Sequence, residues 1–164
     1  MKISKTHDMD SKLPVKFIIH VSAVFTNQQN QILLVKEGNV NKTSYGKYNL
    51  PGGHLELNEG LNNGTAREIK EETGIEVYID FLIGIYTGYS HNHCINYIFH
   101  AEYKGGNIEP QKNEILECNW FSSEQIMHLD NNKILNPKKL KKIITDYVNG
   151  NRAELRIITE NIYG

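Results

Sequence analysis

Residues 53–75 read GHLELNEGLNNGTAREIKEETGI, and this stretch decides the fold expected of the chain. Its second half predicts a helix from about Gly60 to Thr73, because Gly74 can take the left-handed conformation that ends helices. Three carboxylates fall within an arc of about 100° on this helix: Glu68, Glu71 and Glu72. A neighbouring stripe that can face a core is formed by Ala66, Ile69 and Thr73.

The three carboxylates admit two interpretations. Like charges on one helix face repel, and a divalent cation among them turns that crowding into a favourable arrangement. Hard oxygen ligands of this kind suit Mg²⁺ or Mn²⁺. The alternative is a solvated acidic face that pairs with Arg67 and Lys70. For an isolated EIKEE segment the solvated face is the better interpretation, and the surrounding residues reverse that preference.

The surrounding residues match the pattern Gx5Ex7REUxEExGU, in which U is a bulky aliphatic residue, at every specified position. The matching residues are Gly53, Glu59, Arg67, Glu68, Ile69, Glu71, Glu72, Gly74 and Ile75. The chain therefore resembles the Nudix hydrolase family, and in particular its MutT-like members. The likeness continues through LLVK (33–36), YNLPGGHLE (48–56) and NWF (119–121), and it covers most of residues 15–130.

The resemblance implies an α/β fold, a Nudix-type α/β/α sandwich with a mixed β-sheet. It also implies a metal-dependent pyrophosphohydrolase in which water attacks a nucleoside diphosphate linked to a group X. Glu68, Glu71 and Glu72 would be metal ligands, with Glu71 and Glu68 also catalytic. Arg67 would pair with Glu59 or Glu71 and hold the loop against the helix. Gly53 and Gly74 would serve backbone turns.

Three helix glutamates cannot saturate the metal ions and also leave one carboxylate free to deprotonate water, so a further carboxylate is expected. We predict that Glu114 supplies it, as both metal ligand and catalytic residue, because it lies six residues before Trp120. Some MutT-like proteins place an extra metal-binding glutamate at that spacing. Glu117 is the second choice, since it can point outward along its strand.

Outside this segment, alternating apolar residues predict strands at 15–26, 31–37, 76–89, 94–103 and 115–121. The turn at residues 27–30 suggests that the first two strands form a hairpin, and 38–49 reads as a loop. Ser122 or Ser123 can cap a short helix through Leu129. A clearer helix opens at Asn136-Pro137 and ends before Gly150.

Three further residues are candidates for substrate binding: Lys36, which can meet a phosphate, and Tyr48 and Trp120, which can stack on a base. For each of them the alternative is a surface or packing role. A zinc site at His91, His93 and Cys94 lacks a visible fourth ligand, and His20 fits a hydrogen-bonded strand position. Cys94 and Cys118 are interpreted as reduced thiols rather than as a disulfide.

Composition limits the classes of partner. The 164 residues carry a formal net charge of −1, with 39% hydrophobic and 23% charged residues. No large nucleic-acid footprint is expected from this balance, and no apolar run is long enough for a membrane span. We therefore expect a cytoplasmic protein with a small nucleotide substrate, for which a homodimer is one possible assembly. Residues 1–14 read as an N-terminal arm, and 15–164 as a single Nudix domain.

The substrate is the least determined feature. A compact chain with the PGGHLE segment resembles the members that act on nucleoside triphosphates, which is the interpretation we favour. ADP-ribose, nucleotide sugars and dinucleoside polyphosphates are alternatives, although the proline common in ADP-ribose enzymes is Ser90 here. Removal of a 5′ pyrophosphate from RNA is less compatible with the near-neutral charge. A non-catalytic nucleotide-sensing module is the alternative from another class, and the intact REIKEE segment argues against it.

Overall fold

A computed structural model describes residues 16–89 and 92–160. The strands are β1 (Phe17–Phe25), β2 (Ile32–Glu37), β3 (Tyr48–Asn49), β4 (Gly52–His54), β5 (Glu76–Tyr89), β6 (His93–Gly105), β7 (Ile115–Phe121) and β8 (Ala153–Glu154). The helices are α1 (Leu61–Thr73), α2 (Ser123–His128) and α3 (Pro137–Val148), with short 3₁₀ turns η1 (Asn131–Lys133) and η2 (Leu155–Ile157). The N-terminal arm, Ser90 and His91 lie outside the described residues. None of the helices within these ranges is both long and apolar enough to cross a membrane.

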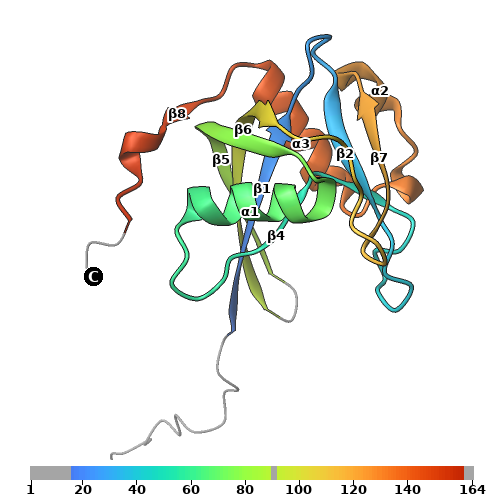
Figure 1. The fold of residues 1–164 in the computed structure, drawn as a ribbon, viewed down its shortest axis with the longest axis horizontal. Coiled ribbons are helices and arrows are strands. Elements are labelled where there is room, and N and C mark those ends of the chain that lie inside the picture. Colours follow the sequence, from blue (N-terminus) through green and yellow to red (C-terminus); the bar gives the residue numbers. More distant parts are fainter. Residues whose placement is uncertain (1–15, 90–91, 161–164) are drawn as a thin grey trace, which may run out of the picture.

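The larger sheet is mixed and lies between helices. Its order is β4-β1-β6-β5-β8, with β1 parallel to β6 and the other neighbours antiparallel. Helix α1 covers one face and α3 lies on the other (Figure 1). This arrangement confirms the predicted α/β/α sandwich with a mixed sheet.

A second, three-stranded sheet has the order β3-β2-β7, and it shows that the predicted β1–β2 hairpin is wrong. The turn is present, because the Asn27 N–H donates to the Gln31 carbonyl at 3.0 Å and Thr26 bridges Ile32. Beyond that bridge the two strands separate into different sheets. One edge of β1 pairs with β6, and one edge of β2 pairs with β7, along the whole strand. On their other edges β1 pairs with β4 at 20–22 and β2 pairs with β3 at 35–36, and β1 and β2 form no ladder with each other beyond the bridge.

Two apolar clusters fill the spaces between the layers. On the α1 side, Ile69 is fully buried against Phe99 and Leu33, as the predicted apolar stripe requires. On the α3 side, Leu140, Ile143 and Ile144 pack against the sheet. Short strand β3 takes the end of the loop predicted at 38–49, and β4 follows just after that loop. Together they carry the chain from the small sheet to the larger one.

The C-terminal segment, which no sequence motif explains, closes over the start of α1. The N-cap residue Gly60 has no side chain that could accept a capping hydrogen bond, and the Glu160 carboxylate lies beside it. The backbone N–H of Asn62 donates to Glu160 Oε1 at 3.4 Å. A carboxylate at this end of a helix is favoured by the unpaired N–H groups and the helix dipole.

We therefore expect Glu160→Ala to lower the free energy of unfolding by about 0.5–2 kcal/mol, the usual cost of losing an N-cap acceptor. Thermal denaturation followed by circular dichroism measures this loss as a lower Tm. Glu160→Gln keeps an acceptor and should lose less, while Glu102→Ala removes an exposed carboxylate from β6 as a control. Equal melting temperatures for all three variants and the wild type would contradict the capping role.

Candidate functional site

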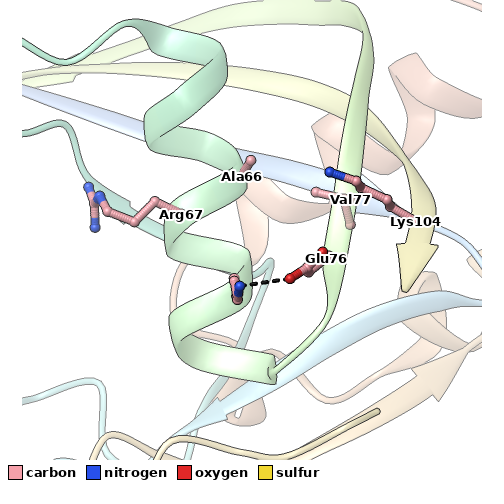
Figure 2. Close-up of a pocket in the computed structure, with 6 residues that line it drawn as sticks. Ala66, Arg67, Glu76, Val77 and Lys104 are labelled. Carbon is pink, nitrogen blue, oxygen red and sulfur yellow. Dashed lines mark hydrogen bonds and ion pairs between the residues drawn. The ribbon is translucent and has the colours of Figure 1, made fainter. Parts of the chain in front are cut away.

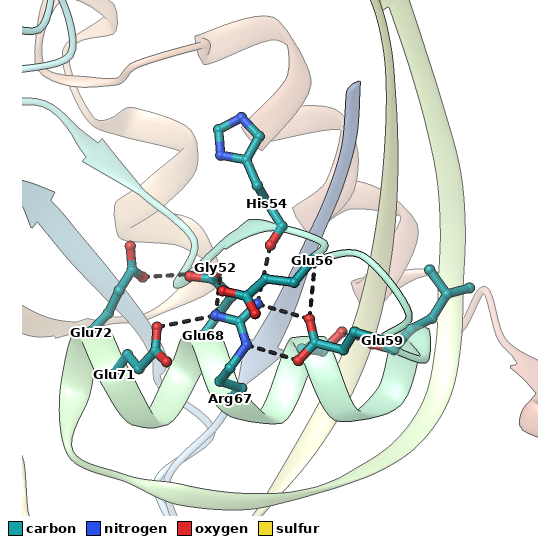
Figure 3. Close-up of polar contacts among 10 residues, drawn as sticks. Gly52, His54, Glu56, Glu59, Arg67, Glu68, Glu71 and Glu72 are labelled. Carbon is teal, nitrogen blue, oxygen red and sulfur yellow. Dashed lines mark hydrogen bonds and ion pairs between the residues drawn. The ribbon is translucent and has the colours of Figure 1, made fainter. Parts of the chain in front are cut away.

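Arg67 is the centre of the polar network on the exposed side of α1 (Figure 3). Its guanidinium donates two hydrogen bonds to the Glu59 carboxylate, from Nε at 2.8 Å and from Nη2 at 2.9 Å. Nη1 donates to Glu68 at 3.0 Å and to Glu71 at 3.1 Å. Nη2 also donates to the His54 carbonyl at 3.2 Å. The expected pairing of Arg67 with Glu59 or Glu71 is thus present with both partners, and it joins the loop, β4 and the helix.

Two adjacent glycines let β4 approach the helix closely. A Cβ atom built on Gly53 would lie 2.3 Å from a carboxylate oxygen of Glu68, so a side chain there would displace the Glu68 carboxylate. Gly52 has φ 143°, and its N–H donates to Glu72 Oε2 at 2.8 Å. At the other end, Gly74 ends α1 with φ 77° and donates its N–H to the Lys70 carbonyl at 2.8 Å. These contacts fix where Glu68 and Glu72 can lie.

Glu72 lies in a concentration of negative charge. Burial raises the pKa of its carboxyl group to about 8, and the charges of Glu37, Glu68 and Glu114 add to the effect, against the hydrogen bond from Gly52. Tertiary structure therefore brings Glu114 near the helix glutamates. Glu37, which the sequence interpretation missed, belongs to the same group and has a pKa raised mainly by burial. Its only sequence signal is a carboxylate at the end of the apolar run ILLV.

The donor set fits a hard divalent cation. The charges of Glu37, Glu68 and Glu114 all act on the Glu72 carboxyl group, and carboxylate oxygens are the ligands that Mg²⁺ and Mn²⁺ prefer. In residues 16–89 and 92–160, no three His, Cys, Asp or Glu side chains are grouped closely enough to hold a metal ion. Arg67 instead draws Glu68 and Glu71 toward itself. A cation at this position would relieve the repulsion that raises the Glu72 pKa.

Lys70 takes no part in this network. Its ammonium pairs with Glu76 at 2.7 Å on another side of the helix. Of the two cations in the alternative interpretation, only Arg67 therefore pairs with the acidic face. Lys70 and Glu76 line a shallow pocket of about 250 Å³ together with Ala66, Val77 and Lys104. Figure 2 shows Glu76 with the last three of these residues. Glu68, Glu71 and Glu72 therefore have no lysine partner among the described residues, and Arg67 is the cation that binds the first two.

The three candidate substrate-binding residues all belong to the small sheet. Lys36 Nζ and the Tyr48 hydroxyl both donate to Glu117, at 2.9 and 2.8 Å. The Tyr48 ring packs edge-on against Phe121, in the cluster on the α3 side. Trp120 packs on Phe25 with ring centroids 5.4 Å apart, in the cluster on the α1 side. Tyr48 and Trp120, each a candidate for stacking on a base, thus pack in clusters on opposite faces of the small sheet.

The structure also shows the surroundings of Glu117, the two cysteines and two of the histidines. Glu117 is held by Lys36 and Tyr48 and so is committed to the small sheet. Cys94 and Cys118 are both free thiols. His93 begins β6 beside Phe17, and His20 lies in β1 next to the His54 ring. Burial lowers the pKa of His20 to about 4, with help from His54 and Lys139.

The loop–helix–loop site on a mixed sheet sandwich defines a hydrolase that acts on phosphoanhydride bonds. The model of the NUDIX domain matches residues 16–143, and the chain belongs to this family. It is a Nudix pyrophosphohydrolase of nucleotide derivatives.

Solved structures of the family share its fold. A NUDIX hydrolase from Nitrosomonas europaea superimposes with a TM-score of 0.77 and 28% identity, covering 88% of this chain and 97% of that one. A MutT protein from Methanosarcina mazei Go1 gives 0.74 and 27%, covering 85% and 99%.

The curated relatives have different substrates in their names. A MutT-like protein of Streptomyces ambofaciens is 27% identical over 77% of both chains. An ADP-ribose pyrophosphatase of Methanocaldococcus jannaschii is 31% identical, over 66% of this chain and 65% of its own. The NAD-capped RNA hydrolase NudC of Stutzerimonas stutzeri is 36% identical over 52% of this chain, which spans only 29% of that protein. These relatives support the common reaction and leave the substrate open.

Proposed function

We propose that this protein hydrolyses nucleoside triphosphates, with Mg²⁺ or Mn²⁺ bound by Glu68, Glu71, Glu72 and Glu114. The observation that carries the proposal is the half-buried Glu72 carboxylate, which accepts a hydrogen bond from the Gly52 N–H and whose pKa is raised by burial and by the charges of further carboxylates. Such a group is unfavourable without a compensating cation. A non-catalytic nucleotide-sensing module would not need this set of carboxylates.

Each part of the site has a defined task in this proposal. When bound, the metal would neutralise phosphate charge and lower the pKa of a water molecule. Glu72 and Glu68 would hold it against the helix, and a neighbouring carboxylate would take the proton of the attacking water. Arg67 fixes the positions of Glu68 and Glu71 through charge-assisted hydrogen bonds. Glu59 and the His54 carbonyl in turn fix the guanidinium.

Glu114 and Glu117 form a natural test pair, because they lie three residues apart with different surroundings. Glu114 adds negative charge to the Glu72 group, whereas Glu117 binds Lys36 and Tyr48. We expect Glu114→Gln to lower turnover at least about tenfold at saturating metal and substrate, and Glu117→Gln to change it little. Steady-state kinetics of the two variants measures the difference. Near-wild-type rates for both would remove Glu114 from the proposed mechanism.

The substrate assignment is tested by a panel assayed with Mg²⁺ and with Mn²⁺. It contains nucleoside triphosphates, ADP-ribose, nucleotide sugars, dinucleoside polyphosphates and NAD-capped RNA. We expect the highest kcat/KM with a triphosphate. A kcat/KM at least about tenfold higher for ADP-ribose or a capped RNA would replace the triphosphate assignment while keeping the reaction.

A further inference from the structure

The segment of residues 153–160 lies outside the part of the chain that the NUDIX model matches, 16–143. It is nevertheless attached to the domain at several points. Its strand β8 pairs with β5, and Leu155 and Ile158 pack against the apolar cluster on the α1 side. Leu61, in the first turn of α1, packs against the same cluster. The segment therefore runs from the sheet to the beginning of the helix that carries the glutamates (Figure 1).

Glu160 supplies at this point what α1 itself lacks. The helix has no acidic residue in its first turn and no side-chain hydrogen bond at its N-cap, Gly60. The Glu160 carboxylate takes this place: Oε1 accepts from the Asn62 N–H at 3.4 Å, and Oε2 lies where a Cβ atom of residue 60 would be. The missing side chain of Gly60 is thus what admits the carboxylate. A distant part of the chain caps the helix.

The capped end of α1 is directly bonded to the residue that anchors Arg67. Glu59 precedes Gly60 in the chain, and its carboxylate accepts two hydrogen bonds from the Arg67 guanidinium. The same guanidinium donates to Glu68 and Glu71. A shift of the first turn of α1 therefore moves Glu59, and with it the group that holds two of the proposed metal ligands. Such ligands must keep their positions to within about 0.5 Å for a site to work.

We propose that Glu160 is a positioning residue of this hydrolase. By capping α1 it fixes Glu59, through Glu59 it fixes Arg67, and through Arg67 it fixes the glutamates that bind the metal. The last of these steps rests on the proposed function of the glutamate site. Glu160 supplies no ligand itself, so its loss loosens the arrangement without removing a donor. Partners that contact metal ligands directly change metal affinity or activity about 10–100-fold, and a residue further out should change them less.

Mn²⁺ binding to the substrate-free protein, measured by calorimetry, tests this role independently of turnover. We expect Glu160→Ala to raise the Kd for Mn²⁺ about 3–10-fold and to lower kcat by a similar factor. Glu160→Gln keeps an acceptor and should change both quantities less. Hydrogen exchange of the backbone amides of residues 55–66 should become at least about threefold faster in Glu160→Ala, because the loop and the first turn of α1 lose their fixed position.

Two control variants separate positioning from stability and from charge. Ser122→Ala removes the capping box of α2, a matched loss of an N-cap on a helix that carries none of the glutamates, and should lower Tm by a similar amount. Glu154→Ala removes an exposed carboxylate from the same C-terminal segment. Both should leave Mn²⁺ affinity, kcat and the exchange of residues 55–66 unchanged. If either variant weakened Mn²⁺ binding as much as Glu160→Ala does, the proposal would be overturned.

A rescue variant moves the cap onto the helix itself. Gly60 has φ −76° and ψ 152°, an extended conformation that serine adopts readily, and serine is a favoured N-cap residue. Its side chain would take the place of the Glu160 carboxylate, which the new Cβ atom displaces. In protein that carries Gly60→Ser, the further substitution Glu160→Ala should therefore change the Kd for Mn²⁺ less than about twofold. An equal 3–10-fold effect with and without Gly60→Ser would refute the capping mechanism.

The same measurements distinguish this proposal from the proposed function. Weaker Mn²⁺ binding and faster exchange in Glu160→Ala, with no hydrolysis of any triphosphate by the wild type, would support the positioning role and refute the triphosphatase assignment. Triphosphate hydrolysis by the wild type, with Mn²⁺ affinity and exchange unchanged in Glu160→Ala, would refute the positioning role alone. A wild-type protein that binds no Mn²⁺ would refute both.

Discussion

Excess EDTA is expected to abolish phosphoanhydride hydrolysis by this protein, and added Mg²⁺ or Mn²⁺ to restore it. The physical reason is the group of carboxylates around Glu72, where burial and the charges of Glu37, Glu68 and Glu114 leave a negative concentration that a cation must neutralise. A pyrophosphate brings further negative charge to the same place. Without a cation the attacking water and the substrate are both repelled.

The measurement is phosphate or pyrophosphate release at fixed substrate, with free metal titrated back after chelation. Ca²⁺ is a useful comparison, because it also binds carboxylates but prefers a larger and more flexible coordination shell. Undiminished hydrolysis in excess EDTA would refute a metal-dependent mechanism. The circular dichroism spectrum should stay unchanged, because the two apolar clusters and not the metal hold the sandwich together.

The second large effect is expected from Glu71→Gln. Glu71 has half of its side chain exposed and accepts one hydrogen bond from Arg67, at 3.1 Å. The amide keeps the size of the side chain and one acceptor but removes the charge. We expect turnover to fall about 10²–10⁴-fold, the range for loss of a metal ligand or a proton acceptor. Stability should be equal or slightly higher, since one like-charge repulsion on the helix face disappears.

Glu76→Gln is the matched control for this variant. Glu76 follows the same helix and pairs with Lys70, but it lies on another side and reaches none of the glutamates near Glu72. An exposed pair of this kind contributes little to stability, so both turnover and Tm should stay close to those of the wild type. If Glu71→Gln and Glu76→Gln had the same turnover, Glu71 would have no catalytic or metal-binding role.

Some features of the fold were predictable from local sequence because they depend on neighbours along the chain. Helix α1 begins and ends within about a residue of the predicted limits, since the apolar stripe and Gly74 are local signals. The caps of α2 and α3 were predictable for the same reason. Ser122 forms a capping box with Gln125, and Asn136 accepts from the Lys139 N–H. The grouping of Glu68, Glu71 and Glu72 also follows from helix geometry alone.

Strand partnership was decided only by tertiary structure. The turn after Phe25 predicted a hairpin, yet β1 and β2 belong to different sheets, because alternation along a strand specifies its faces and not its neighbours. The separation has consequences for the site. It sends Glu37 at the end of β2, and Glu114 before β7, toward Glu72 on α1. No local sequence pattern predicts that Glu37 and Glu114 approach Glu72, since these residues are distant in sequence.

Tertiary structure alone also decided the contacts on the other face of the larger sheet and those of the C-terminal segment. His20, His54 and Asn96 look unrelated in sequence, and strand register alone places them in one row. Glu160 reaches the start of α1 only because β8 pairs with β5 and directs the chain there. The sequence by itself therefore determined helix α1 and its acidic face, because these depend on residues within a few turns. The tertiary structure determined which distant side chains complete the site, because only strand pairing and burial bring them within range of one another.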